Sequence, residues 1–139
     1  MAKEFQARIL TPAAELFSAQ VSEALLPAFD GECGVLADHE DFIGLLGTGV
    51  LKVVTAGDDF WFMVSSGVFE LSNGTLTVLT EVAESAKDIE VEVAKKRAQE
   101  LEPVLATLNS YSEKSHSERI EYDRARARME AYRRTHLVN

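Results

Sequence analysis

The residues best suited to chemistry lie in one acidic stretch, Asp38-His39-Glu40-Asp41. Imidazole and carboxylate groups together could bind a metal ion or transfer protons. In an extended segment, however, successive side chains point to opposite faces, so these four cannot converge without help. We therefore interpret the stretch as an exposed acidic loop around one structural histidine. An acid–base site built from His39 and Asp41 is the third hypothesis for the function.

Two other side chains have chemical potential but a plainer interpretation. Cys33 could be a nucleophile, and we interpret it as a small apolar filler. Trp61 could stack on a base or a sugar, but Phe60-Trp61-Phe62 is typical of a core strand. The glycines near Cys33 are not followed by Lys and a helix, so no phosphate-binding loop is predicted. We expect no catalytic residue, no metal site and no cofactor, and hence no enzyme activity in the chain alone.

The charge of the chain is uneven. The 139 residues carry a formal net charge of −9, with 13 acidic and 3 basic residues up to Ala86 and 10 acidic and 11 basic residues after it. Such an acidic chain lacks the basic face of a general nucleic-acid-binding protein. A single cysteine allows no internal disulfide, which is typical of a reducing compartment. Without an 18-residue apolar run or a signal-peptide pattern, we expect a soluble intracellular protein that reaches a membrane only through partners.

The chain has two parts whose apolar residues recur with different periods, and these parts form the scaffold for the side chains described above. From Phe5 to Thr80 apolar residues recur at every second position, between turn signals such as Asn73-Gly74. This pattern predicts an antiparallel β-sandwich or barrel. After about Glu81 glycine disappears and the period becomes helical, which predicts an antiparallel two-helix hairpin with a polar link at residues 109–114. We place the domains at residues 1–84 and 85–139.

Local signals predict where the helices begin and where one is interrupted. Ser85-Ala86-Lys87-Asp88 and Ser115-His116-Ser117-Glu118 match the capping box that begins many helices. Pro103 lacks a backbone donor and crowds the carbonyl of Gln99, so we expect a kink or break there.

The second predicted helix is rich in arginine. It has four acidic residues, and its six arginines are Arg119, Arg124, Arg126, Arg128, Arg133 and Arg134. We interpret them as a face that binds an anionic surface, because the preceding sandwich is acidic. The alternative is a solvated helix face.

Several motifs, in order and spacing, resemble the epsilon subunit of the F-type ATP synthase. They are Leu16-Phe17-Ser18, Gly31-Glu32-Cys33-Gly34, the loop residue His39, Ser65-Ser66-Gly67-Val68-Phe69-Glu70 and Leu76-Thr77-Val78-Leu79. The resemblance implies a central-stalk rotor subunit whose sandwich docks on the gamma subunit and the c-ring. It also implies that the C-terminal helices restrain ATP hydrolysis at the alpha/beta catalytic head.

The resemblance further implies roles for particular residues. The loop expected to contact the c-ring contains Gly31, Glu32 and His39. The residues expected to meet an acidic helix–turn–helix of the catalytic beta subunit are Arg124, Arg126 and Arg128.

A further motif of the family, through which some members bind ATP, is altered in this chain. Its matching positions are Ile89, Glu90 and Ala94. Glu90 replaces an aspartate, and Val93 replaces the arginine that would pair with a phosphate. We therefore expect weak ATP binding or none.

The resemblance implies a peripheral protein on the cytoplasmic face of the bacterial plasma (inner) membrane. The main alternative is a stand-alone β-sandwich ligand-binding module with a helical dimerisation tail. That alternative predicts a homodimer with a small-molecule pocket near Trp61.

Overall fold

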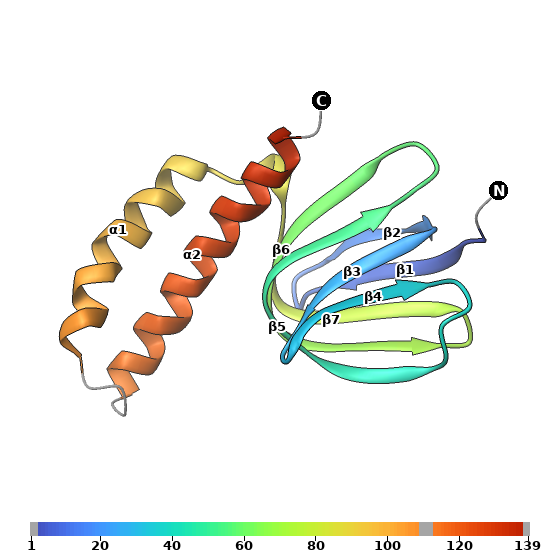
Figure 1. Cartoon of the computed structure of the whole chain (residues 1–139), viewed down its shortest axis with the longest axis horizontal. Coiled ribbons are helices and arrows are strands. Elements are labelled where there is room, and N and C mark those ends of the chain that lie inside the picture. The colour runs from blue at the N-terminus through green and yellow to red at the C-terminus, as the bar shows by residue number, and fades with distance from the viewer. Residues whose placement is uncertain (1–2, 109–112, 138–139) are drawn as a thin grey trace.

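The computed structural model describes residues 3–108 and 113–137, and shows a β-sandwich followed by two antiparallel helices (Figure 1). The strands are β1 (Phe5–Leu10), β2 (Glu15–Val21), β3 (Glu23–Ala28), β4 (Gly31–Leu36), β5 (Phe42–Val54), β6 (Asp59–Ser72) and β7 (Thr75–Ser85). The 3-10 turn η1 (Ala86–Asp88) leads into helices α1 (Val91–Thr107) and α2 (Glu113–Leu137). The predicted fold class is confirmed.

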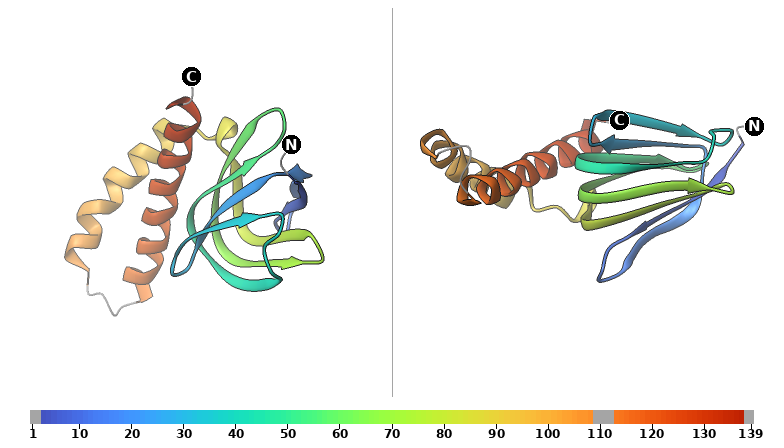
Figure 2. Two further views of the ribbon diagram at one scale, coloured as in Figure 1. Left: turned by 45° about the vertical axis from the view of Figure 1, so that its right-hand side comes forward. Right: turned by 90° about the horizontal axis from the view of Figure 1, so that it is seen from below.

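The strands form one sheet in the order β2-β1-β7-β6-β5-β3-β4, which folds over on itself (Figures 1 and 2). Alternate residues of β1 are buried, as the period of two predicted, and they join a core built from all seven strands. One pairing differs from the predicted antiparallel pattern, because β1 and β7 run parallel. These two strands lie far apart in sequence, so no tight turn fixes their relative direction.

Strands β6 and β7 share an irregularity that redirects their side chains. Ser66 has a φ of 64°. A Cβ on Gly67 would lie 2.0 Å from the carbonyl oxygen of Leu79, so only glycine fits there. The Thr80 hydroxyl lies 2.9–3.2 Å from three carbonyl oxygens, those of Ser65, Ser66 and Val82. On the far side of this irregularity from Asn73-Gly74, β6 and β7 present side chains to the helices as well as to the core.

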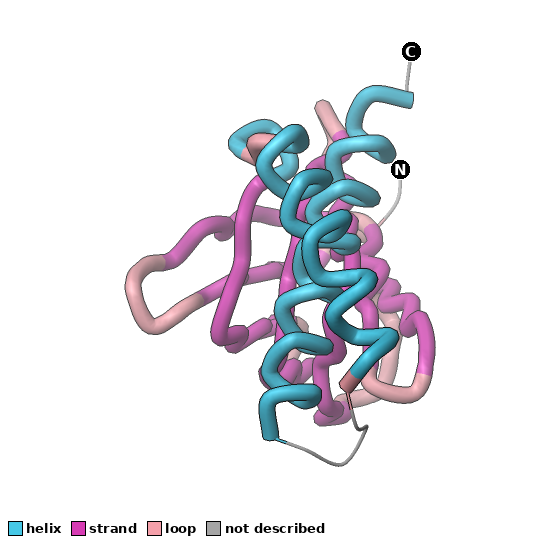
Figure 3. The backbone as a smooth tube through the Cα atoms, turned by 90° about the vertical axis from the view of Figure 1, so that its left-hand side faces the viewer, coloured by secondary structure: helices cyan, strands magenta, loops and turns pink. Residues whose placement is uncertain are grey.

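Helix α2 lies against the sandwich, and α1 lies along the outer side of α2 (Figures 1 and 3). A second buried cluster joins the two parts of the chain and contains Met63, Ala86, Ile89, Ala127 and Ala131. The described helices are not long and apolar enough to cross a membrane.

The stretch from Gly31 to Gly49, which begins with the expected c-ring contact loop, is largely strand. It forms β4 and the start of β5, and only residues 37–41 lie outside strands. Its glycines serve close packing as well as turns, because a Cβ on Gly44 would lie 2.6 Å from the ring of Phe69.

The predicted helix starts were wrong. Ser85 ends β7 and its side chain makes no capping hydrogen bond, while α1 begins only at Val91. Ser115 lies inside α2, which begins at Glu113 because Glu and Lys are good helix formers. The expected break at Pro103 is also absent, since α1 continues to Thr107. Residues 109–112 of the predicted link lie outside the described residues.

The division into domains at residue 84 stays a prediction. The large core cluster contains only residues from β1 to β7, which favours a sandwich that folds by itself. Ala86 and Ile89, however, are buried between the sandwich and α2, so the linker belongs to the contact between the two parts.

Candidate functional site

An apolar row crosses the outer face of four strands. Leu79 of β7 lies opposite Leu10 of β1 on one side and opposite Val68 of β6 on the other. Val68 in turn lies opposite Leu45 of β5. Leu45 and Leu79 are 61% and 50% exposed, and nearby Ile43 is 70% exposed. The outer face of an antiparallel sheet is normally polar, so this apolar row (Leu10, Leu79, Val68 and Leu45) indicates contact with another protein.

The turn between β3 and β4, which we call the β3–β4 tip, continues this exposed surface. Phe29 in the turn is 79% exposed, and its backbone N–H donates to the carbonyl of Leu45 at 2.9 Å. Gly31 has a φ of 134°, a conformation that favours glycine. Glu32 follows in β4 opposite Pro27, and its side chain is exposed. The tip therefore presents an aromatic ring and a carboxylate beside the end of the apolar row.

His39 lies at the opposite end of β4 from Glu32. The six residues of β4 extend over about 20 Å, so the structure does not bring the three predicted c-ring residues together. The His39 ring packs on Phe42, with ring centroids 4.6 Å apart, and its Nδ1 lies 2.8 Å from the Glu40 carbonyl oxygen. These contacts give His39 a packing role. Within residues 3–108 and 113–137, no group of three or more His, Cys, Asp or Glu residues is placed to hold a metal ion.

Cys33 and Trp61 both serve packing. Cys33 is half-buried against the core, and burial, together with the charge of Asp30, raises the pKa of its thiol. A raised pKa disfavours the thiolate that a nucleophile requires. The Trp61 ring packs against the cluster beneath α2, with Lys52 Nζ 4.9 Å and Arg134 Cζ 5.8 Å from its centroid. Trp61 therefore belongs to the contact between the sandwich and α2.

Three arginines predicted to act together lie on different faces of α2. Arg124 and Arg128 are one turn apart and face the sandwich, where Arg128 Nε donates to the Glu84 carboxylate. Arg126 is about 200° around the helix from Arg124 and is exposed. It donates to the Tyr122 hydroxyl at 3.0 Å.

Arg124 is held by a buried polar group that sequence reasoning missed. Arg124 Nε donates to Ser65 Oγ at 2.8 Å, and Ser65, which is fully buried, also bonds Thr48 Oγ1 at 2.7 Å. The second amino group of Arg124 lies 3.6 Å from the Glu81 carboxylate. A buried hydroxyl needs a partner, so these bonds fix the position of α2. The polar pair Ser65-Ser66 in the middle of an apolar strand was the signal that could have found this contact.

The side chains that α2 buries against the sandwich are mostly small. The fully buried residues that α2 contributes to this contact are Ala127 and Ala131. At about 0.8 kcal/mol per buried methyl group, these two side chains contribute about 1–2 kcal/mol, and the surface that α2 covers on Met63 and Trp61 adds to this. Hydrogen bonds to charged groups contribute about 1.5–3 kcal/mol when shielded, and exposed ion pairs about 0–1 kcal/mol. The arginine contacts therefore add to the apolar ones in keeping α2 docked.

Other charged pairs hold the helices internally. Arg97 of α1 donates to Glu121 of α2, and this hydrogen bond lowers the pKa of the Glu121 carboxyl. Arg133 and Arg134 both donate to Glu130 and lower the pKa of its carboxyl to about 2. These pairs lie within the two helices.

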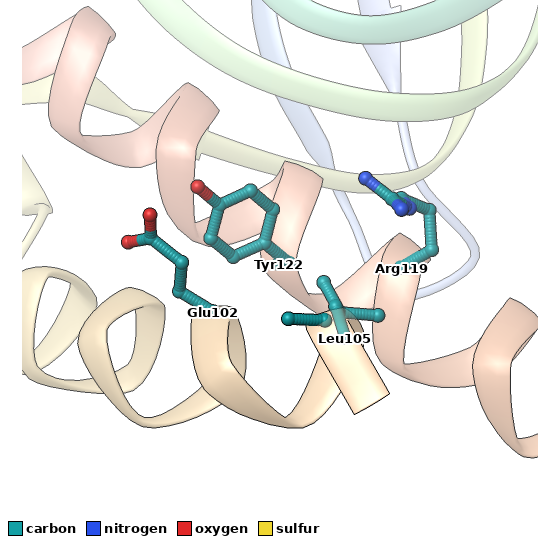
Figure 4. A pocket seen from close by; sticks show the side chains of 5 residues that line it. Glu102, Leu105, Arg119 and Tyr122 are labelled. Carbon is teal, nitrogen blue, oxygen red and sulfur yellow. The ribbon is translucent and has the colours of Figure 1, made fainter. Parts of the chain in front are cut away.

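Two open hollows border α2. The smaller, of about 230 Å³, lies between the helices and is lined by Glu102, Leu105, Ala106, Arg119 and Tyr122 (Figure 4). The larger separates α2 from the β3–β4 tip and from β5, and its lining includes Glu32, Gly47, Arg119 and Arg126. Trp61 lines neither of these two, so neither is the ligand pocket that the alternative hypothesis predicted.

Comparison with known proteins identifies the family of this fold. Residues 4–86 match the family model described as "ATP synthase, Delta/Epsilon chain, beta-sandwich domain". The chain is also 36% identical over 110 residues to an ATP synthase epsilon chain of Desulforamulus reducens. The aligned region covers 79% of this chain and 83% of the relative. The chain belongs to the ATP synthase epsilon chain family.

Likeness to the epsilon chain family continues into the helices. An ATP synthase epsilon chain of Nitratidesulfovibrio vulgaris (strain DP4) is 34% identical over 130 residues, covering 94% of this chain and 91% of the relative. A chain in the cryo-EM structure of the Euglena gracilis mitochondrial ATP synthase has a TM-score of 0.77 at 20% identity, covering 96% of this chain and 81% of that one. At this identity the structural likeness shows the shared fold.

The positions that match the epsilon family's ATP-binding motif are largely structural here. Ile89 is buried in the cluster beneath α2, and Ala94 is buried in α1. Glu90 is exposed, and its carbonyl accepts from the Ala94 N–H at 3.2 Å. Val93, at the position of the motif's arginine, is 61% exposed. The motif therefore offers no cation for a phosphate at that position.

Proposed function

We propose that this chain is the central-stalk rotor subunit of an F-type, proton-translocating ATP synthase. It couples the gamma subunit to the c-ring and restrains ATP hydrolysis at the alpha/beta head through α1 and α2. It performs no catalysis itself. The observation that supports this best is the exposed apolar row on the outer face of a sandwich that belongs to the epsilon chain family.

The two exposed surfaces suit two different partners. The apolar row spans four strands, and such a wide, rigid, apolar surface suits the lasting contact expected with gamma. The β3–β4 tip is narrower and has a carboxylate at its edge, and it suits the polar loops of the c-ring. Gly31 and Glu32 are therefore assigned to the c-ring contact, and His39, at the other end of β4, is placed outside it.

The location of the chain follows from its complex. As an ATP synthase subunit, it is associated with the membrane-bound enzyme. We place it peripherally on the cytoplasmic face of the bacterial plasma membrane, because the relatives from Desulforamulus and Nitratidesulfovibrio are bacterial proteins.

The c-ring contact can be tested by crosslinking in a Cys33→Ala background. Glu32→Cys should form a disulfide with a cysteine placed in the polar loop of the c subunit, because the β3–β4 tip faces that loop. Asp38→Cys, also exposed but at the other end of β4, is the matched control and should not crosslink. A crosslink from position 38 but not from 32 would assign the opposite end of the sandwich to the ring.

ATP should bind the isolated chain weakly or not at all. The reason is that Val93 replaces the arginine of the epsilon family's motif, so the phosphate lacks its expected cation. Isothermal titration calorimetry with MgATP should show no sub-millimolar binding, and Val93→Arg should strengthen whatever binding remains. Sub-millimolar affinity of the unaltered chain would show that other arginines supply the charge.

A further inference from the structure

We propose that Asn73 is a site of spontaneous covalent modification, at which the backbone nitrogen of Gly74 attacks the side-chain amide of Asn73. The product is a mixture of aspartate and isoaspartate at position 73. The site is defined by the turn between β6 and β7, and it does not rest on the proposed function.

This turn is the exposed tip of a two-residue hairpin. Ser72 and Thr75 pair across it, and Asn73 and Gly74 lie between them, both exposed. A Cβ built on Gly74 would meet no heavy atom within 4 Å outside its chain neighbours. The tip lies at the end of the sandwich away from the helices, because β7 leads into η1 and α1 at its other end (Figure 1). Water and the Gly74 nitrogen can therefore both reach the Asn73 amide.

Glycine after asparagine favours the attack, because Gly74 has no Cβ to crowd its backbone nitrogen. That nitrogen forms a bond to Cγ of Asn73 and closes a succinimide ring, while the side-chain NH2 leaves as ammonia with the amide proton of Gly74. Water then opens the ring. Breaking the bond from the nitrogen to Cγ gives aspartate, and breaking the bond from the nitrogen to the backbone carbonyl carbon gives isoaspartate. The reaction needs no oxidant, metal or enzyme.

Two other positions in the sequence meet these conditions less well. Asn109 precedes Ser110, whose side chain crowds the backbone nitrogen that would attack. Asp30 precedes Gly31, but a carboxylate is a poorer electrophile than an amide. Asn73 therefore combines the better electrophile with the less hindered nucleophile.

The folded hairpin slows this reaction without preventing it. Attack requires rotation about the bond between Cα and the carbonyl carbon of Asn73, and the pairing of Ser72 with Thr75 restrains that rotation. Exposed tips of this kind open locally at a small cost in free energy. We therefore expect Asn73 in the folded chain to react about three- to thirtyfold more slowly than in an unfolded peptide of residues 69–78.

Isoaspartate should also disturb the neighbouring strand. It lengthens the main chain at position 73 by one carbon atom, whereas aspartate leaves the main chain unchanged. The Gly74 carbonyl accepts a hydrogen bond from the Gln6 backbone N–H at 3.1 Å, which holds the start of β1 beside the turn. In the isoaspartyl form this bond weakens, so the Gln6 amide should exchange with solvent faster. Leu10 and Leu79 pair further along the same two strands and should keep their contact.

Ageing the folded full-length chain at mildly alkaline pH, in water enriched in oxygen-18, tests the reaction. Peptide mapping by mass spectrometry should find solvent oxygen in the peptide that contains position 73, with both aspartate and isoaspartate there. Isoaspartate is diagnostic, because direct hydrolysis of the side-chain amide gives aspartate alone. The matched control is N73G, since a Gly-Gly turn tolerates the same positive φ. N73G should take up no label in this peptide.

A second comparison tests the effect on the turn. Freshly prepared N73D has the new charge without the longer main chain, so its Gln6 amide should exchange as in the unaged chain. The isoaspartyl fraction of the aged chain should exchange faster at Gln6. Equal exchange in the isoaspartyl fraction and in N73D would contradict the predicted loss of the bond between Gln6 and Gly74.

Two outcomes overturn the proposal itself. One is conversion of less than about one hundredth of Asn73 in the folded chain by the time half of the peptide has reacted, because the hairpin would then protect the residue. The other is aspartate without isoaspartate, because no succinimide would then have formed. Should N73G or N73D fail to fold, the isoaspartate content of the unaltered chain still decides. All measurements use the isolated chain, so failure to bind gamma would leave their results unchanged.

Discussion

Replacing Leu45 and Leu79 with glutamate should abolish stable association of this chain with the gamma subunit. Both side chains lie in the apolar row and are at least half exposed, so water solvates the new carboxylates in the free protein. In the complex, each position loses about 1.5–3 kcal/mol of apolar burial, and an unpaired buried charge costs more. We expect affinity for immobilised gamma to fall by about a hundredfold or more, while the β-type circular dichroism spectrum is unchanged.

The control for this experiment is Leu36→Glu. Leu36 is an exposed leucine of similar accessibility, 57%, but it lies on the edge strand β4 outside the apolar row. L36E should bind gamma like the unaltered chain. Equal losses in L36E and L45E/L79E would mean that any added charge disturbs binding, and full binding by L45E/L79E would assign gamma to another face.

Reversing charge at Arg126 should raise ATP hydrolysis by the assembled enzyme. Arg126 is exposed and bonds only Tyr122 among the described residues, so its reversal leaves the contacts of Arg124 and Arg128 with the sandwich intact. If α2 restrains hydrolysis by meeting carboxylates on the catalytic head, Arg126→Glu turns one attraction into a repulsion. At about 0–1 kcal/mol for each exposed pair, hydrolysis should rise several-fold.

A substitution at Arg126 changes only the contact expected with the catalytic head. Substitutions at Arg124 and Arg128 change that contact and the docking of α2 on the sandwich as well. The reversal R124E/R126E/R128E should also raise hydrolysis, but it sets new carboxylates against Glu81 and Glu84 and so loosens docking as well. The matched control is Lys95→Glu, an equal charge change on α1. Inhibition by the unaltered chain should weaken as salt increases, because ions screen exposed pairs. Equal hydrolysis rates and equal salt dependence for R126E and the unaltered chain would mean that Arg126 is only a solvated side chain.

Local sequence patterns predicted the fold class, because strands and tight turns depend on residues that are close together in the sequence. The period of two predicted the strands, and Asn73-Gly74 forms the expected turn with φ values of 51° and 76°. The parallel pairing of β1 with β7 depends instead on how the whole sheet closes. The irregularity at Ser66 and Gly67 depends likewise on the approach of a second strand, so neither feature has a local signal.

The candidate site was less predictable, because burial decides the role of each residue. Leu45 precedes Leu46 and Leu79 follows Val78, so alternation turns one residue of each pair outward, and only burial in the folded sheet shows which one. Helical geometry separates Arg126 from its neighbours, but the face turned toward the sandwich depends on Ser65, a residue nearly 60 positions away in sequence. The pairing of Glu84 with Arg128 also joins residues that are far apart in sequence, so no local pattern predicts it.

The central claim is that this chain is a rotor subunit, and co-assembly tests it most directly. The full-length chain is mixed with gamma and with detergent-solubilised c-ring, and the molar mass and composition of the product are measured by multi-angle light scattering after gel filtration. The proposed function predicts one copy of this chain per gamma, retained together with the c-ring. A chain that elutes as a homodimer, separate from both gamma and the c-ring, would contradict the claim and support the alternative of a dimeric ligand-binding module.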